Sequence, residues 1–209
     1  MLQPPATRTP QQQRNLANIL GVTKIPENFL LTDMGFATFR LAELTQVRTR
    51  GLSPVTNLGV TYSGSDDDDA LNAGVFRAGS HPDALAFLVS AYDPTGEVPI
   101  PVVTLHTIGD GLVIVENENA YAQTLREAGT RGNLFRAYTN ADGHCAFSGS
   151  EFLAGFKALV DWVQTNVRPT QRRIAADCEE FAAQRGDTCD LNRHFRPAAF
   201  ETRVPAREP

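Results

Sequence analysis

The order strand, helix, strand, helix between residues 98 and 166 is the feature that most constrains the fold of this chain. The run VPIPVVTLHTIGDGLV (98–113) is short and almost continuously apolar, which is typical of a parallel strand buried on both faces. NLFRAYT (133–139) predicts a second strand, and helical patterns follow each strand at ENENAYAQTLREAG (116–129) and GSEFLAGFKALVDWVQTN (149–166). Short connections between such elements favour a right-handed parallel crossover, so this region predicts an α/β unit.

The second of these helices is predicted to be strongly amphipathic. Phe152, Phe156, Leu159 and Val163 lie on one side of it at helical spacing. Ser148 stands directly before the helix, where a hydroxyl accepts from the free backbone amides of the first turn. Ser148 is therefore expected to be a helix cap, although it lies close to a histidine in the chain.

The first half of the chain predicts helices without strands. Residues 1–10 are rich in proline and are expected to be a flexible N-terminus. Residues 11–96 are expected to be helical, with Thr9 as the cap of the first helix and Gly21 as its end. The expected helices are TPQQQRNLANILGV (9–22), PENFLLTDMGFATFRLAELTQVRTRG (26–51) and HPDALAFLVSAYDPTG (81–96).

A run of four aspartates, Asp66 to Asp69, has two interpretations. One is a calcium site or an acidic interaction patch. The other is a helix start, in which Ser65 caps the helix and the carboxylates lie near the positive end of its dipole. The helix start is preferred, because the run lacks the glycine-containing ligand loop of a calcium hand.

Composition excludes several classes of function. The net charge of −5 and the pI near 5.4 provide no basic stripe, so nucleic acid is not an expected partner. The longest apolar runs are far too short for a membrane span, and the N-terminus lacks the pattern of a signal peptide. The four histidines show no ligand spacing, which argues against a zinc site. No metal and no other cofactor is expected.

The three cysteines differ in their surroundings. Cys178 and Cys189 lie in a polar tail, residues 169–209, where a helical turn and a Gly-Asp break bring them within reach of each other. A disulfide is preferred over two free thiols, and it would imply secretion or the cell envelope. Cys145 is expected to be a small buried residue rather than a nucleophile.

Two polar residues stand where an α/β sheet gathers its functional groups, in loops after the strands. Asp110 follows the first predicted strand and His144 follows the second. If the strands are parallel neighbours, the carboxylate can accept from one imidazole nitrogen and leave the other as a base. The remaining histidines, His81, His106 and His194, are expected to be ordinary loop or packing residues.

With these motifs in place, residues 97–168 resemble the C-terminal end of an α/β-hydrolase. In that fold the acid follows the seventh strand in a GD-x-LV-like loop, the histidine follows the eighth strand as GH, and a helix closes the sheet. The resemblance implies that Asp110 is the acid and His144 the base of a triad that hydrolyses small carboxylic esters without a cofactor. Residues 11–96 would then correspond to the helical cap or lid of secreted esterase-like members.

The chain departs from this family in one respect, because no G-x-S-x-G nucleophile turn is present. Ser63 in YSGSD follows a loop and is a poor substitute. We expect the serine to lie upstream of this chain and the chain alone to be inactive. The alternative is a non-enzymatic module that self-associates or complements a missing N-terminal half; an enzyme that uses Cys145 or Ser63 is least favoured.

Overall fold

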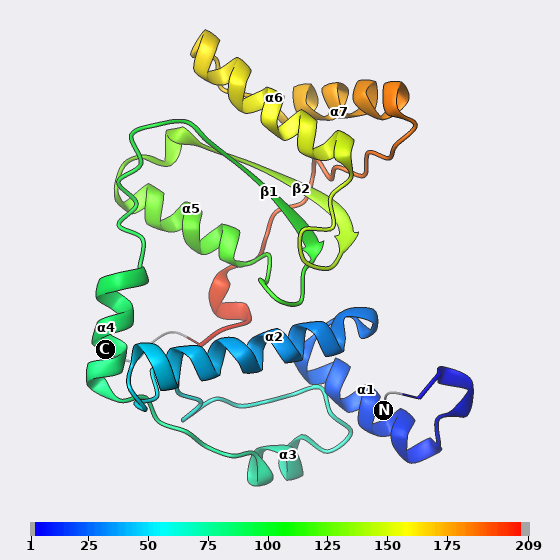
Figure 1. Cartoon of the computed structure of the whole chain (residues 1–209), viewed down its shortest axis with the longest axis vertical. Helices are drawn as coiled ribbons and strands as arrows, with labels where there is room; N and C mark the ends of the chain where they lie inside the picture. Colours follow the sequence, from blue (N-terminus) through cyan, green and yellow to red (C-terminus); the bar gives the residue numbers. More distant parts are fainter. Residues whose placement is uncertain (1–2, 206–209) are drawn as a thin grey trace. The chain divides into compact units, whose positions relative to one another are not determined.

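The computed structural model describes residues 3–205 as a mixed α/β protein with seven α-helices and a two-stranded parallel sheet (Figure 1). The chain divides into an N-terminal unit that ends at Asp93 and a C-terminal unit that begins at Pro94. The N-terminal unit contains α1 (Pro10–Thr23), α2 (Leu30–Ala42), α3 (Asp68–Gly74) and α4 (Pro82–Tyr92). The C-terminal unit contains β1 (Val102–Gly109), α5 (Asn117–Glu127), β2 (Leu134–Asp142), α6 (Gly149–Thr165) and α7 (Gln171–Arg185).

Helix α1 begins as expected and ends later than expected. Thr9 and Gln12 form a reciprocal capping box, and Pro10 occupies the first helical position. The helix continues through Gly21 to Thr23, so the prediction that Gly21 stops it is wrong. A Cβ at Gly21 would overlap the carbonyl oxygen of Gly64, so the glycine is needed for close approach of the Gly64 loop.

The aspartate run is a helix start, although its cap is not the residue predicted. Asp67 caps α3 by accepting from the amide of Ala70, and Asp68 and Asp69 lie in the first turn. Ser65 instead donates its hydroxyl and amide to the Asp68 carboxylate, and these bonds, the hydroxyl first, lower the pKa of Asp68. Within residues 3–205 no group of three or more potential ligand side chains is placed to hold a metal ion.

The sheet is parallel, as the strand–helix–strand order predicts. Val102 pairs with Leu134 and the register continues to Thr107 opposite Thr139, after which Gly109 pairs with Asp142. The second strand thus has one extra residue at this point, which makes a β-bulge at the carboxyl end of the sheet. The expected burial of the first strand on both faces is wrong, because only one β1 residue is fully buried and the others are half-buried.

Helices cover both faces of the sheet, and successive residues of β2 face the helices on opposite sides in turn. Leu134 packs with Ala122 and Leu125 of α5 on one face. On the other face, Phe135 and Ala137 pack with α6 and α7 through a cluster that includes Trp162 and Cys178. Figure 1 shows α5 on one side of the strands and the α6–α7 pair on the other.

Helix α6 buries a different side from the one that its large apolar residues mark. Its buried positions are mostly small, such as Ala154 and Ala158, together with Trp162. Phe152, Phe156 and Val163 are instead 62%, 59% and 62% exposed. The close packing of α6 on the sheet therefore leaves an apolar stripe on its outer side, which we call the α6 outer face.

The polar tail is more ordered than its composition indicates. Thr170 caps α7, and Gly186 ends it in the left-handed conformation with φ 67°. The predicted disulfide between Cys178 and Cys189 is present, with its Cα atoms 5.9 Å apart. Crossing a bilayer would require a longer or more apolar helix than any that the described part of the chain contains.

Candidate acid-base site

Asp110 is held rigidly at the carboxyl end of β1. The strand ends at Gly109, and the chain turns at once so that the amides of Leu112 and Val113 both donate to Oδ1 of Asp110 at 2.9 Å. The Asp110 side chain is only 4% exposed. Two backbone donors on one oxygen fix the carboxylate plane and leave Oδ2 for another partner.

His144 supplies that partner from the loop after β2. Its Nδ1 lies 2.9 Å from Oδ2 of Asp110, and its side chain is 46% exposed. The prediction that these two residues meet is therefore confirmed. Their role in catalysis remains a prediction.

The two loops are joined by backbone contacts that sequence analysis did not identify. The amide of Gly143 donates to the carbonyl of Gly109 at 3.0 Å, and the buried hydroxyl of Thr107 donates to the carbonyl of Gly143 at 2.6 Å. A side chain at Gly109 would overlap Asp142, and Gly143 has a φ of 96°. Both glycines are therefore required for the loop carrying His144 to reach the loop carrying Asp110.

The arrangement sets the chemistry of the imidazole. A carboxylate accepts only, so Asp110 selects the tautomer with the proton on Nδ1 and leaves the lone pair on Nε2. Within the described residues Nε2 has no hydrogen-bond partner. His144 is thus oriented as a base whose reactive nitrogen remains free.

Within the described residues, the side chains that neighbour His144 in the sequence form no hydrogen bond with its imidazole. Cys145 is exposed and has a φ of 53°, so the expectation that it is a small buried residue is wrong. Ser148 caps α6 as predicted, through a capping box with Glu151, and its hydroxyl donates to the carbonyl of Thr188 at 2.7 Å. The hydroxyl of Ser148 is therefore engaged in local structure.

Ser63 is also poorly suited to be a nucleophile. It lies in an irregular segment of the N-terminal unit, before α3, and has no strand leading into it. A nucleophile elbow requires a sharp strand-to-helix turn. Ser63 also belongs to the other unit, and within the described residues no hydroxyl or thiol forms a hydrogen bond with His144.

The other histidines have local roles. His81 caps α4 by accepting from the amide of Asp83 at 3.2 Å, and Nδ1 of His106 lies 2.9 Å from the carbonyl of Thr107. His194 is exposed. None of them joins the Asp110–His144 pair.

Comparisons of the chain with protein-family models, with curated proteins and with solved structures find no match. The assignment of a function therefore depends on the residues and their geometry alone.

Sequence reasoning identified the two side chains that meet, Asp110 and His144, and missed the contacts that position them. The Gly-Asp-Gly sequence at 109–111 signals a turn, but it does not reveal that Leu112 and Val113 donate to the aspartate. For Thr107 the sequence showed only a polar residue near the end of a predicted strand, and its hydrogen bond reaches Gly143 in the loop after β2. Contacts of this kind depend on register, which the sequence pattern did not specify.

Proposed function

We propose that this chain is the C-terminal part of an α/β-hydrolase that acts on small carboxylic esters. The observation that carries the proposal is the 2.9 Å contact between Asp110 and His144 at the carboxyl ends of adjacent parallel strands. A buried acid that orients a half-exposed imidazole is two thirds of a serine hydrolase triad. The serine, in this proposal, is carried by a segment outside these 209 residues.

In the proposed reaction, Nε2 of His144 removes the proton of the serine hydroxyl as the oxygen attacks the ester carbonyl. The imidazolium then returns this proton to the departing alcohol, and the same base activates water for deacylation. Asp110 holds the Nδ1 proton and stabilises the imidazolium without taking the proton itself. No metal or organic cofactor takes part in this scheme.

Two features of the C-terminal unit support a missing partner segment. Within the described residues β1 pairs with β2 on one side only, so no strand pairs with its other edge. The α6 outer face, with Phe152, Phe156 and Val163, is apolar and exposed. Additional strands of a hydrolase sheet would pair with this edge, and neighbouring elements would cover apolar surface of this kind.

A fluorophosphonate probe, which reacts with an activated serine, tests the proposal. The 209-residue chain should remain unlabelled and should not hydrolyse p-nitrophenyl esters above background. The DNA upstream of Met1 should continue in frame and encode a G-x-S-x-G turn. The longer protein should be labelled, and His144→Ala in it should lower turnover by about 10⁶-fold because the serine loses its base.

Two outcomes would contradict the proposal. One is a stop codon directly upstream of Met1 together with an unlabelled chain, which would leave the acid-base pair without a serine. The other is labelling of the 209-residue chain by itself, and mapping the modified residue would then test Ser63 and Cys145.

A second candidate function is a non-enzymatic module that associates with another copy of itself. The α6 outer face favours it, because exposed apolar stripes commonly mark interaction surfaces. In this case light scattering of the purified chain should give a dimer, and Phe152→Ser with Phe156→Ser should convert it to a monomer. A wild-type monomer would exclude self-association.

A further inference from the structure

A basic cavity lies at the side of β2, away from the acid-base pair. It has a volume of about 330 Å³. The residues that line it include Tyr138 and four arginines: Arg131, Arg136, Arg168 and Arg196. These arginines are far apart in the sequence, from residue 131 to residue 196, and only the fold brings them together. The negative net charge of the chain concealed this positive site from sequence analysis.

The four guanidinium groups are held in place by neutral acceptors. Arg131 and Arg168 both donate to the carbonyl of Leu134, at 2.9 and 2.6 Å. Arg136 donates to the carbonyl of Glu118 at 2.7 Å, and Arg196 donates to the carbonyl of its neighbour Phe195 at 2.6 Å. The cavity wall is therefore organised before any ligand arrives.

Carboxylates do not neutralise these charges. None of the four arginines forms an ion pair within residues 3–205. Glu118 acts electrostatically on Tyr138, but its carboxylate accepts from the hydroxyl of Thr104 at 2.7 Å. Burial, followed by the like charges of Arg136 and Arg168, lowers the pKa of Arg131, as expected where positive groups crowd together.

Tyr138 provides an independent indication of a ligand. Tyr138 is one of the residues that line the cavity, it is only 2% exposed, and its buried hydroxyl has no hydrogen-bond partner. An unmet buried hydroxyl is costly, and native proteins rarely leave one without a partner. Burial raises the pKa of Tyr138 to about 12, so the phenol keeps its proton and can donate to an anion.

Helix α7 adds a further positive contribution. Its N-cap Thr170 and its first residue Gln171 also line the cavity. The N-terminus of a helix of this length carries partial positive charge and free amide donors. The cavity offers donors from the arginine side chains, the Tyr138 phenol and the start of α7, which are more than the two oxygens of a carboxylate can accept. A phosphoryl group has three or four oxygens and two negative charges, and so matches these donors better.

We infer that this cavity binds a phosphoryl group, either as free phosphate or as the phosphate monoester of a small molecule. The site is separate from the proposed ester chemistry and does not depend on it. Arg168 also stacks on Trp162, with its guanidinium carbon 5.9 Å from the ring, so occupancy should alter the fluorescence of this single tryptophan. Binding can thus be measured without any assay of hydrolysis.

The test titrates the 209-residue chain with inorganic phosphate and with glycerol 3-phosphate at constant ionic strength, followed by Trp162 fluorescence and calorimetry. Both should bind saturably, and tighter binding of one ligand identifies the source of the phosphoryl group. Arg196→Gln should weaken binding by about tenfold, the loss expected for one charge-assisted hydrogen bond. Tyr138→Phe should weaken it by about threefold, because it removes a neutral donor.

Arg193→Gln is the matched control, since Arg193 lies on the same segment as Arg196 but does not line the cavity. It should leave affinity unchanged within about twofold. The inference is overturned if phosphate has no effect beyond that of chloride, or if Arg193→Gln weakens binding as much as Arg196→Gln. It is also overturned if single-stranded DNA competes equally per phosphate, since this would indicate a general polyanion surface.

Discussion

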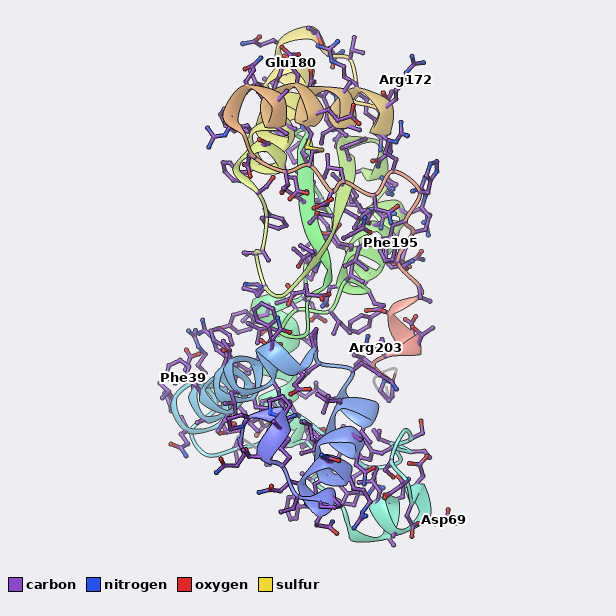
Figure 2. All side chains as sticks on the ribbon, turned by 90° about the vertical axis from the view of Figure 1, so that its right-hand side faces the viewer. Phe39, Asp69, Arg172, Glu180, Phe195 and Arg203 are labelled. Carbon is purple, nitrogen blue, oxygen red and sulfur yellow. A yellow bond between two sulfur atoms is a disulfide. The ribbon has the colours of Figure 1, made fainter. Side chains whose placement is uncertain are left out.

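The two units of this protein differ in how much apolar surface they bury. Among the described residues of the N-terminal unit, the buried apolar ones are Leu16, Leu30, Pro54 and Ala84, whereas the C-terminal unit contains two clusters built on its sheet. In the N-terminal unit, Phe39 of α2 is 62% exposed, and Figure 2 labels it. Good local helix signals therefore do not guarantee a core, because a helix also needs a surface to pack against.

The difference has a functional counterpart. Asp110, His144 and the arginine cavity all belong to the unit with the larger core. Geometry accurate enough for acid-base chemistry requires loops fixed by packed elements. We therefore expect the C-terminal unit to be the more stable one, and its single tryptophan, Trp162, reports its unfolding selectively.

The largest expected effect comes from a core truncation. Leu125 is 0% exposed, and Leu125→Ala should lower the free energy of unfolding of the C-terminal unit by about 3 kcal/mol. The matched change Leu31→Ala, at a 60% exposed position of α2, should alter stability by less than about 0.5 kcal/mol. Urea titrations followed by Trp162 fluorescence and by circular dichroism measure both. Equal losses at the two positions would remove the contrast between the units.

Removal of the disulfide should come next. Cys178 lies in the same cluster as Trp162, and replacing Cys178 and Cys189 by serine should destabilise the C-terminal unit by about 2–3 kcal/mol according to the loop-closure model. Hydrogen exchange of α1 and α2 should not change. Faster exchange there would indicate that the two units unfold together.

A smaller effect is expected in the N-terminal unit. Gly21→Ala should cost about 1–3 kcal/mol, because the new methyl group would overlap the Gly64 backbone. Gly35→Ala is the control: it lies within α2 with no atom in its way and should stabilise that helix by up to about 1 kcal/mol. Hydrogen exchange in α1 and α2 reports both changes. Unchanged exchange in the Gly21 variant would mean that α1 does not pack on the Gly64 loop.

The smallest effect concerns pH. The pKa of Tyr138 is raised from 10.0 to about 12, so folding favours the protonated phenol. This contribution to stability is complete below pH 10 and is lost as the pH rises toward 12. Tyr138→Phe should therefore reduce the alkaline loss of stability measured by Trp162 fluorescence, while leaving stability at neutral pH similar or slightly higher. An identical loss of stability at alkaline pH in the wild type and in Tyr138→Phe would show that Tyr138 does not cause it.

The sequence predicted much of the C-terminal unit because its signals are local. Alternating strand and helix patterns, the Ser148 cap and the two cysteines each depend on nearby residues, and the paired site followed from the rule that parallel strands end together. The failures involve packing. Gly21 lies within α1 instead of ending it, at the point where the backbone of Gly64 approaches the helix. Phe152 and Phe156 face outward because small residues allow α6 to approach the sheet closely.

The arginine cavity shows the same limit most clearly. Arg131, Arg136, Arg168 and Arg196 have no common motif, and only the return of the chain after α6 and α7 brings them to one side of β2. A net charge reports the sum over the molecule and says nothing about local concentration. Sites assembled from distant segments cannot be read from composition.

The most direct test of the account is the tautomer of His144, which requires no nucleophile. Long-range ¹H–¹⁵N spectra of the 209-residue chain, recorded above the ordinary titration range of histidine, should show a protonated Nδ1 and a bare Nε2 for His144. Asp110→Asn should shift the proton toward Nε2, while exposed His194 should be unchanged. A proton on Nε2 of His144 in the wild-type chain would show that Asp110 does not orient the imidazole as a base and would contradict the account.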